Sequence, residues 1–66
     1  MDKAKNLLVL REKDGKTELG RYRTAEQLKK ARLKIDRPTR VFDATVVRGI
    51  IIELVEITKL VDQGLV

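Results

Sequence analysis

Charged and apolar residues are unevenly distributed along this chain, and the distribution constrains its fold. Residues 1–40 contain thirteen Lys or Arg against six Asp or Glu, whereas residues 41–66 contain two against four and are mostly Val, Ile and Leu. Apolar side chains form the core of a folded protein and charged side chains stay at its surface. The pattern therefore predicts a small hydrophobic scaffold with a cationic surface mounted on it, which bears on how the protein meets partners and does not specify what it does.

The length of the chain predicts a single small domain, residues 1–66. A domain of this size buries only about 60% of the surface that its unfolded chain exposes, so its stability should be marginal or shared with a second copy. The chain is 42% hydrophobic, and its two aromatic residues, Tyr22 and Phe42, are expected in the core. This apolar content favours a folded domain despite 38% charged residues.

The composition favours a binding protein over an enzyme. Cys, His, Ser and Trp do not occur in the sequence, so disulfides, thiolate metal sites and the usual general base are excluded. Glu53 and Glu56 are interpreted as solvated charges rather than as a catalytic or metal-binding pair. No cofactor is expected.

Apolar runs in the sequence are short. None approaches the roughly 20 residues that a membrane-spanning helix needs. The sequence therefore predicts no membrane association. Together with the absence of Cys, it predicts a cytoplasmic location.

An Asp-Gly pair at residues 14–15 lies between two strand-like runs, residues 6–12 and 17–23. This pattern predicts a β-hairpin with a tight type I′ turn. A two-residue turn places Arg11 opposite Glu18, which avoids setting like charges against each other. The register assigns two faces. One carries Leu7, Val9, Gly20 and Tyr22. The other carries Leu8, Leu10, Leu19, Arg21 and Arg23.

A helix is predicted directly after the hairpin. Residues 24–27, Thr-Ala-Glu-Gln, match a capping box, in which Thr24 and Gln27 each bond a backbone amide of the other residue. The helix should run to about Ile35, because Pro38 prevents its continuation. Its apolar stripe is narrow, and Leu33 lies outside that stripe among charged residues.

The C-terminal segment has two competing periodicities. Residues 40–47 and 50–59 are rich in Val and Ile and predict two strands around a turn at residues 48–49. Helical spacing is also present over residues 50–61, followed by a Schellman-like stop at Gly64. We favour strands, at least to Ile57. The predicted fold class is small α+β, ββαββ with one helix packed on an antiparallel sheet; the alternative is ββαβα with a C-terminal helix.

The two predicted C-terminal strands are apolar on both faces, which one short helix cannot cover. Their turn would align Phe42, Ala44 and Val46 with Ile51, Val55 and Ile57 beneath the helix. The other face would then expose Val41, Val47, Ile50, Ile52 and Leu54. A second copy is the simplest cover, so the sequence predicts a homodimer.

The basic residues after the hairpin provide the functional hypothesis. Between the second strand and Pro38, a cationic edge could follow a phosphate backbone. The alternative interpretation is that these residues are ordinary solubilising surface charge. The candidate nucleic-acid-binding residues are Arg21, Arg23, Lys29, Lys30, Lys34 and Arg37. The favoured function is a DNA-binding module, and the alternative is a protein-interaction or regulatory module that binds an acidic partner.

Overall fold

The computed structural model describes residues 3–66, which form one four-stranded antiparallel sheet and two helices. The elements are β1 (Lys5–Glu12), β2 (Glu18–Tyr22), α1 (Ala25–Leu33), β3 (Thr39–Val47), β4 (Ile50–Glu56) and α2 (Thr58–Asp62). The strand order is β2-β1-β3-β4, so β2 and β4 are the edge strands. The predicted α+β class and the ββαββ order are confirmed, and the C-terminal helix of the alternative follows as α2.

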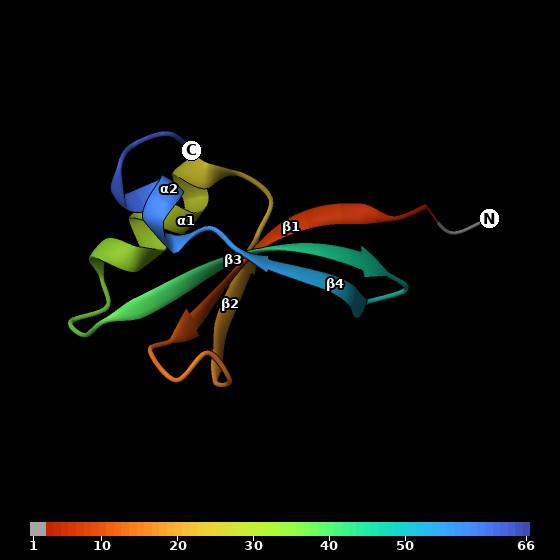
Figure 1. Ribbon diagram of the computed structural model, residues 1–66, viewed down its shortest axis with the longest axis horizontal. Coiled ribbons are helices and arrows are strands. Elements are labelled where there is room, and N and C mark those ends of the chain that lie inside the picture. The colour runs from red at the N-terminus through yellow and green to blue at the C-terminus, as the bar shows by residue number, and fades with distance from the viewer. Residues whose placement is uncertain (1–2) are drawn as a thin grey trace.

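The two helices lie together at one end of the molecule, and the sheet extends away from them (Figure 1). The molecule is elongated, with principal dimensions of 39 × 23 × 18 Å. At the far end lie the start of β1 and the turn between β3 and β4. We call residues 44–55, the part of this hairpin beyond the helices, the β3–β4 arm.

The two hairpin turns differ from each other and partly from expectation. Arg48 and Gly49 have φ values of 54° and 78°, and Val47 pairs with Ile50. Two consecutive positive φ values in a two-residue loop characterise a type I′ turn. In the first hairpin Gly15 has a positive φ of 73° but its predecessor does not. The predicted hairpin is therefore present, whereas its type I′ turn is not.

A bulge in β2 changes the faces predicted for that strand. Arg11 pairs with Glu18 as predicted, but the neighbouring pair is Leu10 with Gly20. Leu19 is the extra residue of the bulge, and every later residue of β2 is shifted to the opposite face. The prediction that Gly20 shares a face with residues 7 and 9 is therefore wrong.

A second bulge lies in β4. Thr45 pairs with Glu53, and the register shifts at the next pair, which leaves Ile52 as the extra residue. Leu54 consequently lies on the face opposite the helices, and Val55 pairs with Asp43 on the helix face. Leu54 and Val55 therefore lie on the faces predicted for them.

The prediction that Phe42, Ala44, Val46 and Ile51 pack beneath the helix is wrong, because they form the core on the opposite face. Val41, predicted on the exposed face, pairs with Leu10 and is buried beneath the helices.

The sheet has a core on each face. On the helix face, the buried residues are Leu10, Leu28, Val41 and Val61, and the half-buried residues packed on them include Tyr22, Ile35 and Ile57. On the opposite face, the buried residues are Val9, Phe42, Ala44 and Val46, packed with Leu7, Ile51 and Leu54. The burial expected for Phe42 is confirmed, since it is 8% exposed. Tyr22 is only half-buried.

The end of α2 confirms the Schellman motif predicted at Gly64. The Gly64 amide donates to the Val61 carbonyl at 3.1 Å, and the Leu65 amide donates to the Leu60 carbonyl at 2.9 Å. Gly64 has the positive φ that this motif uses, 74°. With nine residues in α1 and five in α2, neither described helix is long and apolar enough to cross a membrane.

Candidate functional site

Helix α1 begins where the capping pattern predicted. The Gln27 amide donates to the Thr24 hydroxyl at 3.2 Å, which satisfies one of the free amides of the first turn. The Gln27 side chain reaches back to the amide of Arg23, also at 3.2 Å, one residue earlier than in a standard capping box. These two bonds fix the position of Arg23 relative to the helix.

Two side chains hold α1 on the sheet. Leu28 is fully buried in the helix-face core. The Arg32 guanidinium lies 2.7 Å from the Asp62 carboxylate of α2, and its Nε donates to the buried Thr39 hydroxyl at 3.0 Å. Arg32 therefore joins α1 to both α2 and β3, and the remaining face of α1 is directed to solvent.

Cationic side chains occur along the solvent side of α1 and at its two ends, where Arg23 precedes the N-cap and Lys34 is the C-cap. Arg23, Lys29, Lys30 and Lys34 are all exposed, and within residues 3–66 their side chains make no hydrogen bond or ion pair. We call these four residues the α1 cationic surface. Residues 23–37 contain six basic residues and two acidic ones, so the local charge is strongly positive.

Arg21 is separated from the α1 cationic surface. Because of the β2 bulge, it pairs with Val9 and projects on the face opposite the helices. Its Nε lies 3.0 Å from the Glu18 carboxylate, and its Nη1 donates to the Gly49 carbonyl at 3.1 Å. The predicted continuous edge from strand to helix is interrupted at this residue.

Arg37 follows α1 and is ion-paired with Glu12 of β1. Both residues line a shallow hollow with Lys13 and Pro38. Its charge is therefore partly neutralised, unlike the charges of the α1 cationic surface. Of the six candidate residues, the structure places Lys29 and Lys30 within α1 and Arg23 and Lys34 beside its two ends, and it gives carboxylate partners to Arg21 and Arg37.

A shallow groove separates α1 from α2. It is lined by Lys29, Arg32, Leu33, Val61 and Asp62. Leu33 is 88% exposed, the most exposed of the large apolar side chains described. The sequence signal for this groove was the position of Leu33 outside the apolar stripe of its helix; the contribution of α2 had no such signal.

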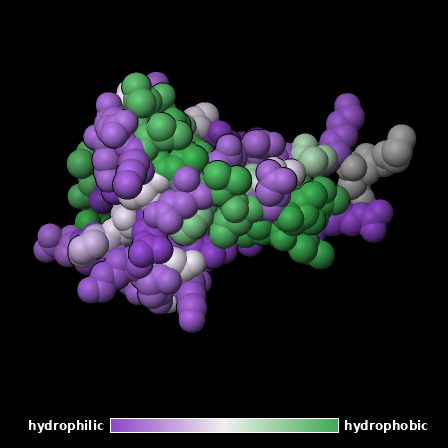
Figure 2. Space-filling view, in the orientation of Figure 1, coloured by the Kyte–Doolittle hydropathy of each residue, from purple (hydrophilic) through white to green (hydrophobic). Residues whose placement is uncertain are grey.

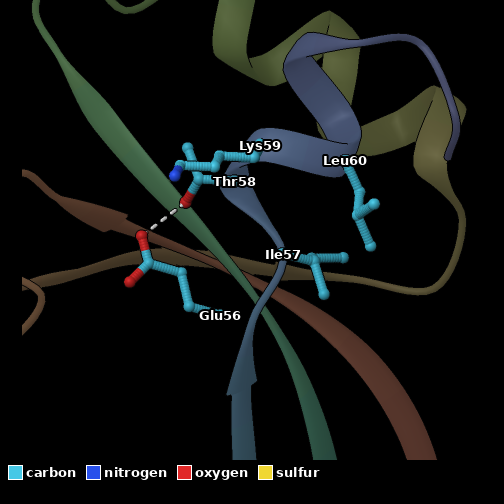
Figure 3. Close-up of a pocket in the computed structure, with 5 residues that line it drawn as sticks. All are labelled: Glu56, Ile57, Thr58, Lys59 and Leu60. Atoms are coloured by element: carbon cyan, nitrogen blue, oxygen red, sulfur yellow. Dashed lines mark hydrogen bonds between the residues drawn. The ribbon is translucent and has the colours of Figure 1, made fainter.

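A second hollow lies where β4 passes into α2 (Figure 3). The Thr58 hydroxyl donates to the Glu56 carboxylate at 2.8 Å and accepts from the Val41 amide at 3.0 Å. Glu56 also lies 3.9 Å from the guanidinium of Arg40. These polar groups bind one another and the β3 backbone, so they fix the strand-to-helix junction.

The acidic residues of β4 point to opposite faces, as the strand interpretation predicted. Glu53 pairs with Thr45 on the helix face and Glu56 pairs with Phe42 on the other. Among residues 3–66, no three carboxylates gather at one point.

Asp14 organises the β1–β2 loop. Its carboxylate accepts from the Lys16 amide at 2.7 Å, and from the Thr17 amide and hydroxyl, each at 3.1 Å. The Lys16 amide, followed by the Thr17 amide, lowers the pKa of Asp14 because both bonds favour the ionised carboxylate. The role of this residue is local and structural.

Neither family models nor curated proteins nor solved structures gave a match to this chain. The geometry of the described residues is therefore the basis for the function proposed below.

Proposed function

We propose that this protein is a non-enzymatic, cytoplasmic binding module and that it binds nucleic acid, DNA in the first instance, through the α1 cationic surface. The observation that carries the proposal is the set of four exposed cationic side chains along α1 and at its two ends, none of them neutralised by a carboxylate of the described chain. A capped helix held by Leu28 and Arg32 presents these charges from a fixed backbone.

The expected mode of binding is contact with phosphates. Lys and Arg side chains that neutralise phosphates release condensed counterions, which favours association and makes it dependent on salt. Four phosphate contacts correspond to a slope of about −3 to −4 in a plot of log affinity against log salt concentration. Arg21 and Arg37 are also proposed to contact phosphates. Their contributions to DNA affinity should be smaller, because each already has a carboxylate partner.

The test is fluorescence anisotropy with a labelled DNA duplex at several salt concentrations. The double variant Lys30→Glu/Lys34→Glu should bind at least tenfold more weakly than the parent, about 1.4 kcal/mol or more. The matched control is Lys3→Glu/Lys5→Glu, which makes the same change in net charge at the end of the sheet away from the helices. It should lose less affinity than the α1 variant.

Two results would contradict the proposal. One is an absence of DNA binding by the parent at about 50 mM salt, where phosphate contacts are strong. The other is an equal loss of affinity in both double variants, which would mean that net charge and not the α1 cationic surface is responsible. Circular dichroism on each variant confirms that the helix is intact.

We further propose that the protein is a homodimer and that the β3–β4 arm forms its interface. Ile50, Ile52 and Val55 of the edge strand β4 are 65%, 63% and 51% exposed. Figure 2 shows apolar surface at this end of the molecule. Clustered apolar side chains on an edge strand are typical of an association surface.

A protein-interaction module is the second candidate function, and Leu33 is the observation that favours it. An apolar side chain that is 88% exposed lies on the same helix as the α1 cationic surface. Phosphates offer such a side chain nothing to pack against. A partner protein with acidic and apolar residues would engage both features.

A further inference from the structure

The groove between α1 and α2 combines an exposed apolar side chain with a shallow apolar floor. Leu33 rises from α1 with 88% of its surface exposed, and Val61 of α2 lies beside it with 6% exposed. Figure 2 shows apolar surface over the helices that is separate from the apolar end of the sheet. An incoming apolar side chain would therefore contact Leu33 and remove it from water.

The charges around Leu33 are selective for an acidic partner. Lys29 and Lys30 precede Leu33 by four and three residues, so they are its neighbours on the helix surface. Neither has a partner in the described chain. Asp62 is the one carboxylate among the five residues that line the groove, and Arg32 neutralises it at 2.7 Å.

We infer that this groove docks an acidic segment of a partner protein, with an apolar side chain of that segment packed on Leu33 and its carboxylates facing Lys29 and Lys30. The inference rests on the second candidate function, protein interaction, and is independent of DNA binding. Charge complementarity supplies orientation and association rate, and burial of the apolar pair supplies affinity. A nucleic acid would use the lysines and leave Leu33 exposed.

The test adds a short peptide of repeated Asp-Glu-Leu-Leu units to isotope-labelled protein. Binding is monitored through the amide chemical shifts in NMR spectra. We expect shift changes at Lys29, Leu33, Val61 and Asp62, and little change along the β3–β4 arm. A matched peptide in which Ala replaces every Leu should bind at least about tenfold more weakly, because it lacks the apolar anchor.

Variants of the protein separate this inference from the nucleic-acid proposal. Leu33→Ser should lower the affinity for the Leu-containing peptide by about tenfold and leave the affinity for DNA unchanged. Leu65→Ser is the matched control, because Leu65 is 68% exposed and does not line the groove. It should leave peptide binding unchanged.

Several other outcomes would overturn the inference. Equal binding of the two peptides would show that charge alone is recognised. Shift changes confined to the β3–β4 arm would show that the groove is not a docking site. The absence of any shift change at a peptide concentration of about 1 mM would show the same, because binding weaker than this is not of interest. A loss of DNA affinity in Leu33→Ser would assign the groove to nucleic acid instead. DNA binding that fails in the parent while the peptide still binds would overturn only the nucleic-acid proposal.

Discussion

At the residue scale, Gly15 shows how one backbone conformation closes the first hairpin over the core. Its φ of 73° lies in the left-handed region, and a Cβ at this position would lie 3.5 Å from the Arg40 guanidinium and 3.8 Å from the Phe42 ring. Its carbonyl accepts from Arg11 at 2.8 Å, and the Arg11 guanidinium lies 5.3 Å from the centre of the Phe42 ring. The loop therefore covers the core on the face opposite the helices.

Replacing Gly15 with Val should reduce the free energy of unfolding by at least about 1 kcal/mol, because a β-branched residue resists a positive φ. Urea denaturation monitored by circular dichroism measures the change. Gly15→Asn is the matched control and should lose less, because Asn adopts the left-handed region more readily. If Gly15→Val is as stable as the parent, residue 15 does not need a positive φ in solution.

Asp14 provides a pH-dependent contribution to the same loop. The Lys16 and Thr17 amides lower its pKa in the folded state, so the ionised carboxylate stabilises the fold at pH values above the unfolded pKa. This contribution is lost as pH falls through the folded pKa. In an NMR titration of the side-chain carboxyl carbons, Asp14 should titrate below the ordinary Asp value of about 3.9. A midpoint at or above that value would contradict the bonds to Lys16 and Thr17.

At the element scale, the two sides of α1 make different contacts. Leu28 is fully buried and attaches the helix to the sheet, and Arg32 links it to α2. The α1 cationic surface and Leu33 then remain in solvent. The short helix α2 completes the helix-face core with Val61 and forms the second wall of the groove.

The division of tasks on α1 predicts unequal effects of two Leu→Ala substitutions. Leu28→Ala should lower the free energy of unfolding by about 2 to 5 kcal/mol, which is much of the stability that a domain of this size possesses. Leu33→Ala should change stability by less than about 0.5 kcal/mol, because the side chain is 88% exposed. Thermal and urea melts of the two variants measure the difference. Equal losses would mean that Leu33 is buried in solution, which would also contradict the proposed docking site.

At the scale of the whole molecule, the elongated shape separates two surfaces. The helices and their cationic and apolar groups lie at one end, and the β3–β4 arm lies at the other (Figure 1). Self-association through the arm would therefore leave the helix end accessible. A dimer would present two copies of the α1 cationic surface to one partner.

The proposed homodimer makes a specific prediction for analytical ultracentrifugation. The parent should sediment as a dimer at micromolar concentration, because burial of each exposed β4 side chain contributes about 1.5 to 3 kcal/mol before the cost of association. Ile50→Lys/Val55→Lys should be a folded monomer. The control Leu33→Lys/Leu65→Lys adds the same charge at exposed positions outside the arm and should remain a dimer. A parent that is monomeric at all concentrations would contradict the proposal.

Local sequence patterns determined where most elements begin and end. The Asp-Gly pair, the cap at Thr24, the turn at residues 48–49 and the stop at Gly64 all occur where the sequence predicted them. Each of these signals depends on residues close together in the chain, through turn conformations and amide bonds. The boundary between β4 and α2 had no such signal, because strand and helix periodicities overlap over residues 50–61. The strand favoured to Ile57 ends at Glu56, and α2 begins at Thr58.

The tertiary structure decided which side chains face each other. The bulges at Leu19 and Ile52 reverse the faces of the residues that follow them, because strand side chains alternate and one extra residue shifts the whole set. The partners of Arg21, Arg32 and Arg37 likewise depend on contacts between elements distant in sequence. The sequence therefore determined how many cationic residues follow the first hairpin. Only the packing of the elements decided which of them are ion-paired and which remain exposed along α1 and at its ends.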